Sequence, residues 1–344
     1  MTGEARIIRG DARSLPLADG TVDLIVTSPP YFALRSYKDG GEHYDGQIGD
    51  ETTPEAFIDS LLEVTRECVR VLKPTGSLWV NLGDKYAGSN GQSGGVSQIN
   101  TVSPDGTRSK DAKKGGFVPS TKVRPKSLIG VPWRYTLRCI DDLGLILRAE
   151  VIWAKPNGLP ESVTDRVARK HEQWFHFTLN ERYYASVEEI REAHLHFAGF
   201  VGHAKTYGQD RNDDGRRNVA KRDALGKLPG SVWTVATEPL QVDPALGVDH
   251  FAAFPTEFPR RIILGWCPPD GIVLDPFGGT GTTAAVAKAL GRIGISNDMS
   301  ADYCRLADWR CNGAGYDRVW AKVHGTEPVK RNETQLALFD DTAA

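Results

Sequence analysis

One segment constrains the fold more than any other: an apolar run ends in an aspartate, turns through three glycines within four residues and leads into a helix-like stretch. Its residues are Val273, Leu274, Asp275, Pro276, Phe277, Gly278, Gly279, Thr280, Gly281, Thr282 and Thr283. This order predicts a strand, a tight turn and a helix, where backbone N–H groups can approach a nucleotide-like ligand. It is neither the dinucleotide-binding GxGxxG nor a P-loop, because no Gly-Lys-Ser/Thr follows. A tight strand-to-helix turn without a ligand is the alternative.

The rest of the chain alternates apolar strands with amphipathic helices. The continuous apolar run at 22–27 is typical of a strand buried on both faces of a parallel sheet. The predicted strands are 6–11, 22–27, 77–82, 145–153, 172–179, 273–275 and 292–297, and the predicted helices are 54–72, 132–143, 257–266, 282–290 and 301–311. Such alternation predicts an α/β fold whose central sheet is mostly parallel and has helices on both faces.

Composition limits the class of protein. With 344 residues, of which 40% are hydrophobic, the chain can bury a large core as one elaborated α/β domain or as two. Because the formal net charge is -2, a nucleic-acid partner would have to meet local basic patches. No apolar run is long enough to span a bilayer, and the first residues lack the shape of a signal peptide. The five cysteines show no metal-ligand spacing, so we expect a cytoplasmic protein with reduced thiols and no metal.

A second motif follows the strand at 22–27, at the kind of strand end where open α/β sheets bind ligands. It consists of Ser28, Pro29, Pro30 and Tyr31. A hydroxyl, the Pro29 carbonyl and an aromatic plane together suit a planar base that is held by its exocyclic amino group while a ring stacks on its face. A proline-rich loop with a core tyrosine is the alternative.

With both motifs, the chain resembles the DNA amino-methyltransferases that use S-adenosylmethionine. Their base-amine site reads (Ser/Asp/Asn)-Pro-Pro-(Tyr/Phe), and their cofactor loop reads Asp-Pro-Phe-x-Gly-x-Gly-Thr-Thr. Here the catalytic motif comes before the cofactor loop, as in the permuted β group of that family. The resemblance covers nearly the whole chain, and its landmarks include the segments 153–157 and 171–172. It implies a Rossmann-like methyltransferase fold with a circularly permuted motif order and an inserted target-recognition region.

The resemblance also implies which residues hold the cofactor. The cofactor loop would comprise Asp275, Pro276, Phe277, Gly278, Gly279 and Gly281, with Thr282 and Thr283 at the helix start. Asp11 would lie near the adenine of the cofactor, and Phe254 with Pro255 near its methionine end. The carboxylate for the ribose hydroxyls is assigned to Asp298, while Ser296 stands where the family usually has glycine. Ordinary strand-end aspartates are the alternative for Asp11 and Asp298.

The catalytic residues implied are Ser28, Pro29, Pro30 and Tyr31. Hydrogen bonds from a base amine to Ser28 and to the Pro29 carbonyl would aim the nitrogen lone pair at the methyl group, while Tyr31 stacks on the flipped-out base. Methylation of a cytosine ring carbon would need a cysteine nucleophile, and the Pro-Cys dipeptide of that family is absent. Lys155 and His171 look like acid–base candidates, but we expect them to serve the structure or base-pocket contacts instead.

The amine that is modified is a separate question. Ser-Pro-Pro-Tyr is the form seen mostly in cytosine-N4 enzymes, so we expect cytosine N4 rather than adenine N6, although both amines have the same geometry. Other readings are a non-catalytic DNA-binding relic and a methyltransferase for RNA or for a protein glutamine. The long basic insertion favours duplex DNA.

Four regions are expected along the chain. Residues 1–193 would form the catalytic half, 194–242 the target-recognition region, 243–325 the cofactor-binding half and 326–344 a flexible tail. A mobile basic insertion is expected at about residues 85–126 within the first region.

Partners follow from the charges and the tail. Contacts with double-stranded DNA are expected in the basic segments 108–126 and 203–227. The tail carries an apolar cluster that matches the peptide by which bacterial replication proteins dock on the sliding clamp. That cluster comprises Gln335, Leu336, Leu338 and Phe339. Packing of the tail on its own domain is the alternative, and a homodimer is a further expectation.

Overall fold

The computed structural model describes residues 3–33, 38–39, 42–43, 46–88, 122–158, 160–192, 226–240, 242–248 and 253–326. Its main strands are β1 Glu4–Arg9, β2 Val22–Thr27, β5 Leu72–Leu82, β6 Ile146–Ala154, β7 His171–Thr178, β8 Val232–Thr234, β9 Ile272–Asp275 and β10 Ile293–Asp298. A separate small hairpin pairs β3 Lys38–Asp39 with β4 Glu42–His43. The helices are α1 Pro54–Val71, α2 Val131–Leu143, α4 Glu257–Trp266, α5 Thr282–Ala289, α6 Ala301–Cys311 and α7 Tyr316–His324, with 3-10 turns η1 Val187–Ile190 and η2 Pro244–Leu246.

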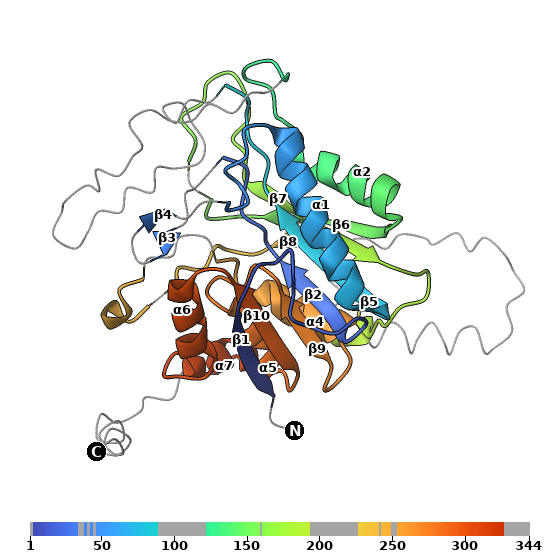
Figure 1. Ribbon diagram of the computed structural model, residues 1–344, viewed down its shortest axis with the longest axis vertical. Coiled ribbons are helices and arrows are strands. Elements are labelled where there is room, and N and C mark those ends of the chain that lie inside the picture. The colour runs from blue at the N-terminus through green and yellow to red at the C-terminus, as the bar shows by residue number, and fades with distance from the viewer. Residues whose placement is uncertain are drawn as a thin grey trace, which may run out of the picture.

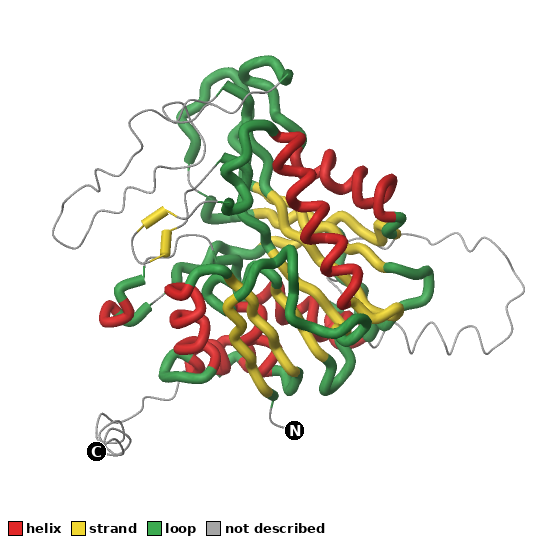
Figure 2. The backbone as a smooth tube through the Cα atoms, viewed as in Figure 1, coloured by secondary structure: helices red, strands yellow, loops and turns green. Residues whose placement is uncertain are grey.

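One eight-stranded sheet forms the centre of the protein, in the order β1-β10-β9-β2-β5-β7-β6-β8 (Figures 1 and 2). The first five strands in this order are parallel, and β7 is antiparallel to both of its neighbours. The carboxyl ends of β1, β10, β9, β2, β5 and β6 therefore meet the start of β7 at one edge. This arrangement confirms the predicted α/β fold, and it places the loops after β2 and β9 next to each other although they are far apart in the chain.

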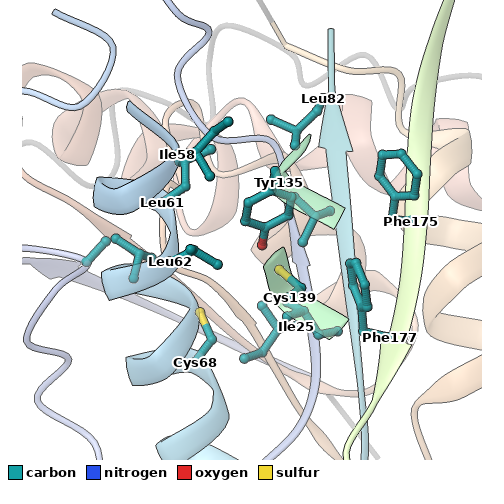
Figure 3. Close-up of a cluster of buried hydrophobic side chains, with 14 of the residues drawn as sticks. Ile25, Ile58, Leu61, Leu62, Cys68, Leu82, Tyr135, Cys139, Phe175 and Phe177 are labelled. Atoms are coloured by element: carbon teal, nitrogen blue, oxygen red, sulfur yellow. The ribbon is translucent and has the colours of Figure 1, made fainter. Parts of the chain in front are cut away.

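Helices cover both faces of the sheet. Along β2, Ile25 points to one face, whereas Leu24 and Val26 point to the other. The first face packs against α1 and α2, whose side chains Leu61, Tyr135 and others fill the core drawn in Figure 3. The second face packs against α4 and α5, α6 packs against β1 and β10 beside α5, and α7 packs on α5 and α6. Burial on both faces explains why β2 reads as a continuous apolar run.

Local sequence signals set the helix boundaries. Thr53 caps α1 by accepting a hydrogen bond from the Ala56 N–H at 3.1 Å, and Pro54 occupies the first turn. In place of a capping residue in its own sequence, α2 uses the distant Asp84, which accepts from the N–H groups of Gly130 and Val131. This contact attaches α2 to the end of β5.

Three elements were not predicted from the sequence: β8, the β3–β4 hairpin and α7. In α7 the buried residues are Val319, Ala321 and Val323, whose spacing of two hides the helical period. Strand β8 has only three residues, too few for a pattern. None of the described helices is long and apolar enough to cross a membrane.

Candidate active site

The glycine loop, residues 275–283, begins at Asp275, the last residue of β9, which is only 2% exposed. Thr27 Oγ1 donates to one carboxylate oxygen at 2.7 Å, and Thr283 Oγ1 donates to the other at 3.0 Å. The Phe277 N–H is a third donor at 3.1 Å. Burial raises the pKa of the Asp275 carboxyl to about 7, although the three hydrogen bonds act in the opposite direction. This side chain joins the ends of β9 and β2 to the start of α5.

Gly278 lies directly against β10. A Cβ atom at this position would be 1.9 Å from Ser296 Oγ, so no side chain fits there. The Gly278 N–H donates to the Asn297 carbonyl at 2.8 Å. Within the described part of the chain, the buried Ser296 Oγ has no hydrogen-bond partner. The serine that departs from the pattern of the resembling family is thus accommodated directly beneath the loop.

Asp298 ends β10 beside the glycine loop. One of its oxygens accepts from the Gly279 N–H and the other from the Ser300 N–H, each at 2.9 Å. Asp11 follows the adjacent strand β1, and the Gly10 N–H donates to the Asp298 carbonyl at 2.9 Å. Arg13 forms an ion pair with Asp11 at 2.7 Å. Partial burial raises the pKa of the Asp11 carboxyl, but the hydrogen bonds and charge of Arg13 outweigh burial and leave the pKa below its usual value.

A buried cation supports the glycine loop from the other side. Arg310, on α6, is 5% exposed, and its Nη1 donates to Thr280 O, Thr280 Oγ1 and Thr282 Oγ1 at 2.9, 2.6 and 2.8 Å. Burial lowers the pKa of this guanidinium. The described residues place no carboxylate in an ion pair with Arg310, so its charge is compensated by loop oxygens.

Phe254 and Pro255 precede α4, on the same side of the sheet as α5. The ring of Phe254 packs edge-on against Trp174 of β7, with centroids 5.4 Å apart. The next residue, Thr256, donates through its N–H and its hydroxyl to Glu238 at 3.0 and 2.9 Å. Glu238 is also paired with Lys322 of α7. The segment at 254–256 is therefore anchored to β7 and α7.

Ser28 and Tyr31 converge on a single buried amide. Asn81, 1% exposed near the end of β5, has its Oδ1 within hydrogen-bond distance of Ser28 Oγ at 3.2 Å and of the Tyr31 hydroxyl at 2.9 Å. Its Nδ2 donates to the Gln173 carbonyl at 3.0 Å. Because the amide nitrogen is engaged there, the amide oxygen faces the two hydroxyls. Among the described residues, no group donates to the Pro29 carbonyl.

A charged pair stands behind Tyr31. The Tyr31 hydroxyl lies 2.8 Å from Glu172 Oε2, and Lys155 Nζ donates to Glu172 Oε1. Both charged side chains are only 18% exposed, and Lys155 Nζ lies 4.0 Å from the centroid of the Trp153 ring. Lys155 is thus held in an ion pair, whereas His171, the other acid–base candidate, is exposed at the first position of β7.

The two motifs share one site. Besides the Thr27–Asp275 hydrogen bond, Pro29 and Phe277 line the same small cavity, together with Thr27 and Pro276. All predicted site residues belong to the described residues, and they gather at the edge where the parallel strands end.

Sequence reasoning missed four residues that hold this site: Asn81, Glu172, Glu238 and Arg310. Asn81 left a signal, because it is the polar residue inside an otherwise apolar strand end. Glu172 appeared only as a landmark of the resemblance. Nothing in the local sequence distinguishes Glu238 or Arg310 from surface charges.

The chain is thus an α/β protein that carries a glycine loop and a Ser-Pro-Pro-Tyr loop at neighbouring strand ends, where open sheets of this kind bind ligands. Known proteins narrow this class. The family model described as DNA methylase matches residues 22–308. The chain is 35% identical over 313 residues to the type II methyltransferase M.Cfr9I of Citrobacter freundii, covering 90% of this chain and 88% of that protein. It is 36% identical over 313 residues to M.SmaI of Serratia marcescens, covering 89% and 90%. The chain therefore belongs to the N6/N4 DNA methylase family.

A solved structure supports the fold. The PvuII DNA methyltransferase, titled cytosine-N4-specific, matches with a TM-score of 0.60 and 19% identity over 95% of each chain. At that identity the match concerns the fold, which is thereby confirmed as Rossmann-like.

Several expectations fall outside the described residues. They are most of the basic insertion, with residues 89–121, most of the target-recognition region, with residues 193–225, and the tail from residue 327 on, which includes Gln335, Leu336, Leu338 and Phe339. Clamp binding and the homodimer stay predictions.

Proposed function

We propose that this DNA methylase transfers a methyl group from S-adenosylmethionine to the exocyclic amine of a flipped-out base in duplex DNA, with cytosine N4 as the target. The observation that carries the proposal is the pair of hydroxyls on Asn81 next to the Asp275 loop. Cofactor and base would meet where β9 and β2 lie side by side.

The residues at the ends of β1, β10 and β9 fit S-adenosylmethionine. Asp298 offers a carboxylate that suits the ribose hydroxyls, because the Gly279 and Ser300 N–H groups fix its orientation beside the glycine loop. Asp11 would lie near the adenine, and Phe254 with Pro255 near the methionine end. The glycine loop would contact the bound cofactor. Its residues are Asp275, Pro276, Phe277, Gly278, Gly279 and Gly281, followed by Thr282 and Thr283 at the start of α5. The bound cofactor supplies an electrophilic methyl group.

Ser28 would act as an acceptor for the base amine. The Asn81 amide is fixed by its bond to Gln173, so Asn81 Oδ1 takes the hydroxyl hydrogen of Ser28. The lone pairs of Ser28 Oγ then remain for an N–H of the base. A second amine N–H would reach the Pro29 carbonyl, to which no described group donates. Two acceptors on one nitrogen favour a pyramidal amine whose lone pair points at the methyl group.

Tyr31 would stack on the extruded base, and Pro30 fixes the backbone between these groups. The Tyr31 ring is itself supported by Gly83, where a Cβ would be 2.6 Å from Tyr31 Cε2. The amine is neutral before transfer, so no base has to activate it, and the N–H proton that the methylated nitrogen must lose afterwards would pass through the Ser28 Oγ acceptor to water.

Cytosine N4 is favoured over adenine N6 because residue 28 is serine. The family covers both amines, whose hydrogen-bond geometry is alike, so adenine N6 is the alternative. The matched relatives named type II methyltransferases suggest a protein that modifies a defined DNA sequence, in a restriction-modification setting.

Duplex DNA would contact a basic surface formed by the described residues of 122–128, 155–158 and 160–170. Lys126 pairs with Asp165, and the Arg166 guanidinium lies 4.0 Å from the centroid of the Tyr86 ring, whose backbone bridges to Leu128, so these segments lie side by side. The basic surface comprises Lys122, Arg124, Lys126, Arg166, Arg169 and Lys170. Lys170 is two residues from Glu172, which places this charge beside the proposed base site. Phosphates of the duplex are the ligands that such a surface attracts.

Sequencing tests the proposal directly. DNA from bacteria that express the protein should carry a methylated amine at one short sequence, read by a method sensitive to base modification. DNA from bacteria that express Ser28→Ala should lack the mark. An unmodified genome in both strains, or an equal mark in both, contradicts the proposal.

A further inference from the structure

The Tyr31 hydroxyl has a single hydrogen, and two of the described acceptors lie within hydrogen-bond distance of it. Glu172 Oε2 lies 2.8 Å and Asn81 Oδ1 lies 2.9 Å from its hydroxyl oxygen. A carboxylate is the stronger acceptor, because a hydrogen bond to an ionised group is shorter and roughly twice as strong as one between neutral groups. The phenol therefore donates to Glu172 in preference to Asn81.

The acceptor that takes the phenolic hydrogen of Tyr31 determines how strongly Ser28 can donate to Asn81. Asn81 Oδ1 also receives the hydroxyl of Ser28, at the longer distance of 3.2 Å. The amide oxygen has two lone pairs and can accept from both hydroxyls, but a phenol that donated from 2.9 Å would weaken the longer bond from Ser28, because two donors on one oxygen share its electron density. When Glu172 takes the phenolic hydrogen, Asn81 Oδ1 is left to Ser28, and the Ser28 lone pairs stay available as acceptors.

Lys155 completes this arrangement. Its ammonium pairs with the other oxygen of Glu172, and the side chains of Lys155 and Glu172 are each 18% exposed. The pair joins the end of β6 to the start of β7, where Trp153 lies opposite Glu172 in the antiparallel register. The ammonium also sits over the Trp153 ring, which fixes it from the far side. Glu172 therefore has its charge compensated on the side away from Tyr31.

We propose that Glu172 is a positioning residue: paired with Lys155, it accepts the phenolic hydrogen of Tyr31 and so reserves Asn81 Oδ1 for Ser28. It would set the hydrogen-bond direction of both side chains without touching the base. This inference rests on the proposed function, because it concerns how the same site orients its acceptor.

The Glu172→Gln variant tests the idea because an amide has a donor end. The amide nitrogen cannot face the Lys155 ammonium, so the amide oxygen turns to Lys155 and the nitrogen turns to Tyr31. The phenol is then redirected to Asn81 and weakens the bond from Ser28. We expect the single-turnover methylation rate to fall about tenfold at saturating DNA and S-adenosylmethionine, roughly the effect of one misdirected hydrogen bond.

Two double variants separate positioning from simple damage. In a Tyr31→Phe background there is no phenolic hydrogen, so adding Glu172→Gln should cause no further loss. Adding Lys155→Met to Glu172→Gln removes the ammonium, which lets the amide oxygen turn back to Tyr31 and should restore most of the rate. Glu4→Gln, which removes an exposed ion pair with Arg6 at the far end of β1, is the matched control and should keep the wild-type rate.

The substrate is a duplex that carries the sequence found methylated in the sequencing experiment. The inference is overturned if Glu172→Gln keeps the wild-type rate, if its effect multiplies with that of Tyr31→Phe, or if Lys155→Met deepens the loss. Melting temperatures within a few degrees of wild type show that the variants are folded. A wild-type protein that methylates no DNA amine would instead defeat the proposed function, and the two failures are thereby distinguishable.

Discussion

Asp275 makes the stability of this protein depend on pH in a way that one substitution should remove. Burial raises the pKa of its carboxyl from an ordinary 3.8 to about 7 in the folded protein. Between these values the folded state keeps a proton that the unfolded chain has lost, so the contribution of Asp275 to stability falls as pH rises and is constant above about 7. Between pH 5 and pH 8 this contribution changes only up to about pH 7, that is over about two pH units. The free energy of unfolding should therefore fall by about 3 kcal/mol on account of Asp275.

Urea unfolding of the wild type and of Asp275→Asn at pH 5 and pH 8 measures this effect. Asparagine does not titrate, so the free energy of unfolding of the variant relative to wild type should improve by about 3 kcal/mol between pH 5 and pH 8. Asp165→Asn removes an exposed carboxylate and should show no such gain. Parallel pH profiles for wild type and Asp275→Asn would refute the claim that this carboxyl is held neutral by burial.

Three further predictions concern the site. Asp298→Asn should weaken S-adenosylmethionine binding about tenfold in calorimetry, through the loss of a charged acceptor; unchanged affinity would remove Asp298 from the cofactor site. Asn81→Leu should lower the single-turnover rate about a hundredfold and leave cofactor affinity unchanged, because it frees the Ser28 hydroxyl to donate rather than accept; a wild-type rate would contradict that role. Replacing Arg124, Arg169 and Lys170 together by alanine should reduce the slope of log K against log salt for DNA binding by about 3, one for each lost phosphate contact; an unchanged slope would place the DNA elsewhere.

The sequence was sufficient for the fold because its strands are buried on both faces. The run at β2 and the strand-turn-helix at β9 and α5 leave few alternatives to a parallel sheet. Their neighbouring positions in the sheet bring Ser28 to Asp275, although 246 residues separate them in the chain. The order and position of the two motifs were thus enough to predict that their loops lie side by side.

The contacts of Glu172 and Arg310 that support the two loops could not be predicted from the sequence in the same way. Glu172 meets Tyr31 only because β7 runs antiparallel to β5, and single-sequence patterns do not determine that pairing. Arg310 looks like a surface charge on α6, yet the packing of α6 against α5 buries it under Thr280. Such residues are identified by long-range packing, which local periodicity does not encode.

The most direct test of the central claim is the identity of the nucleoside that the purified protein methylates. DNA should be incubated with the protein and S-adenosylmethionine, digested to nucleosides and analysed by mass spectrometry against N4-methylcytosine, N6-methyladenine and 5-methylcytosine standards. The account predicts N4-methylcytosine with the wild type and none with Ser28→Ala. N6-methyladenine would overturn the choice of base while keeping the amine chemistry, and either 5-methylcytosine or no methylated nucleoside would contradict the account.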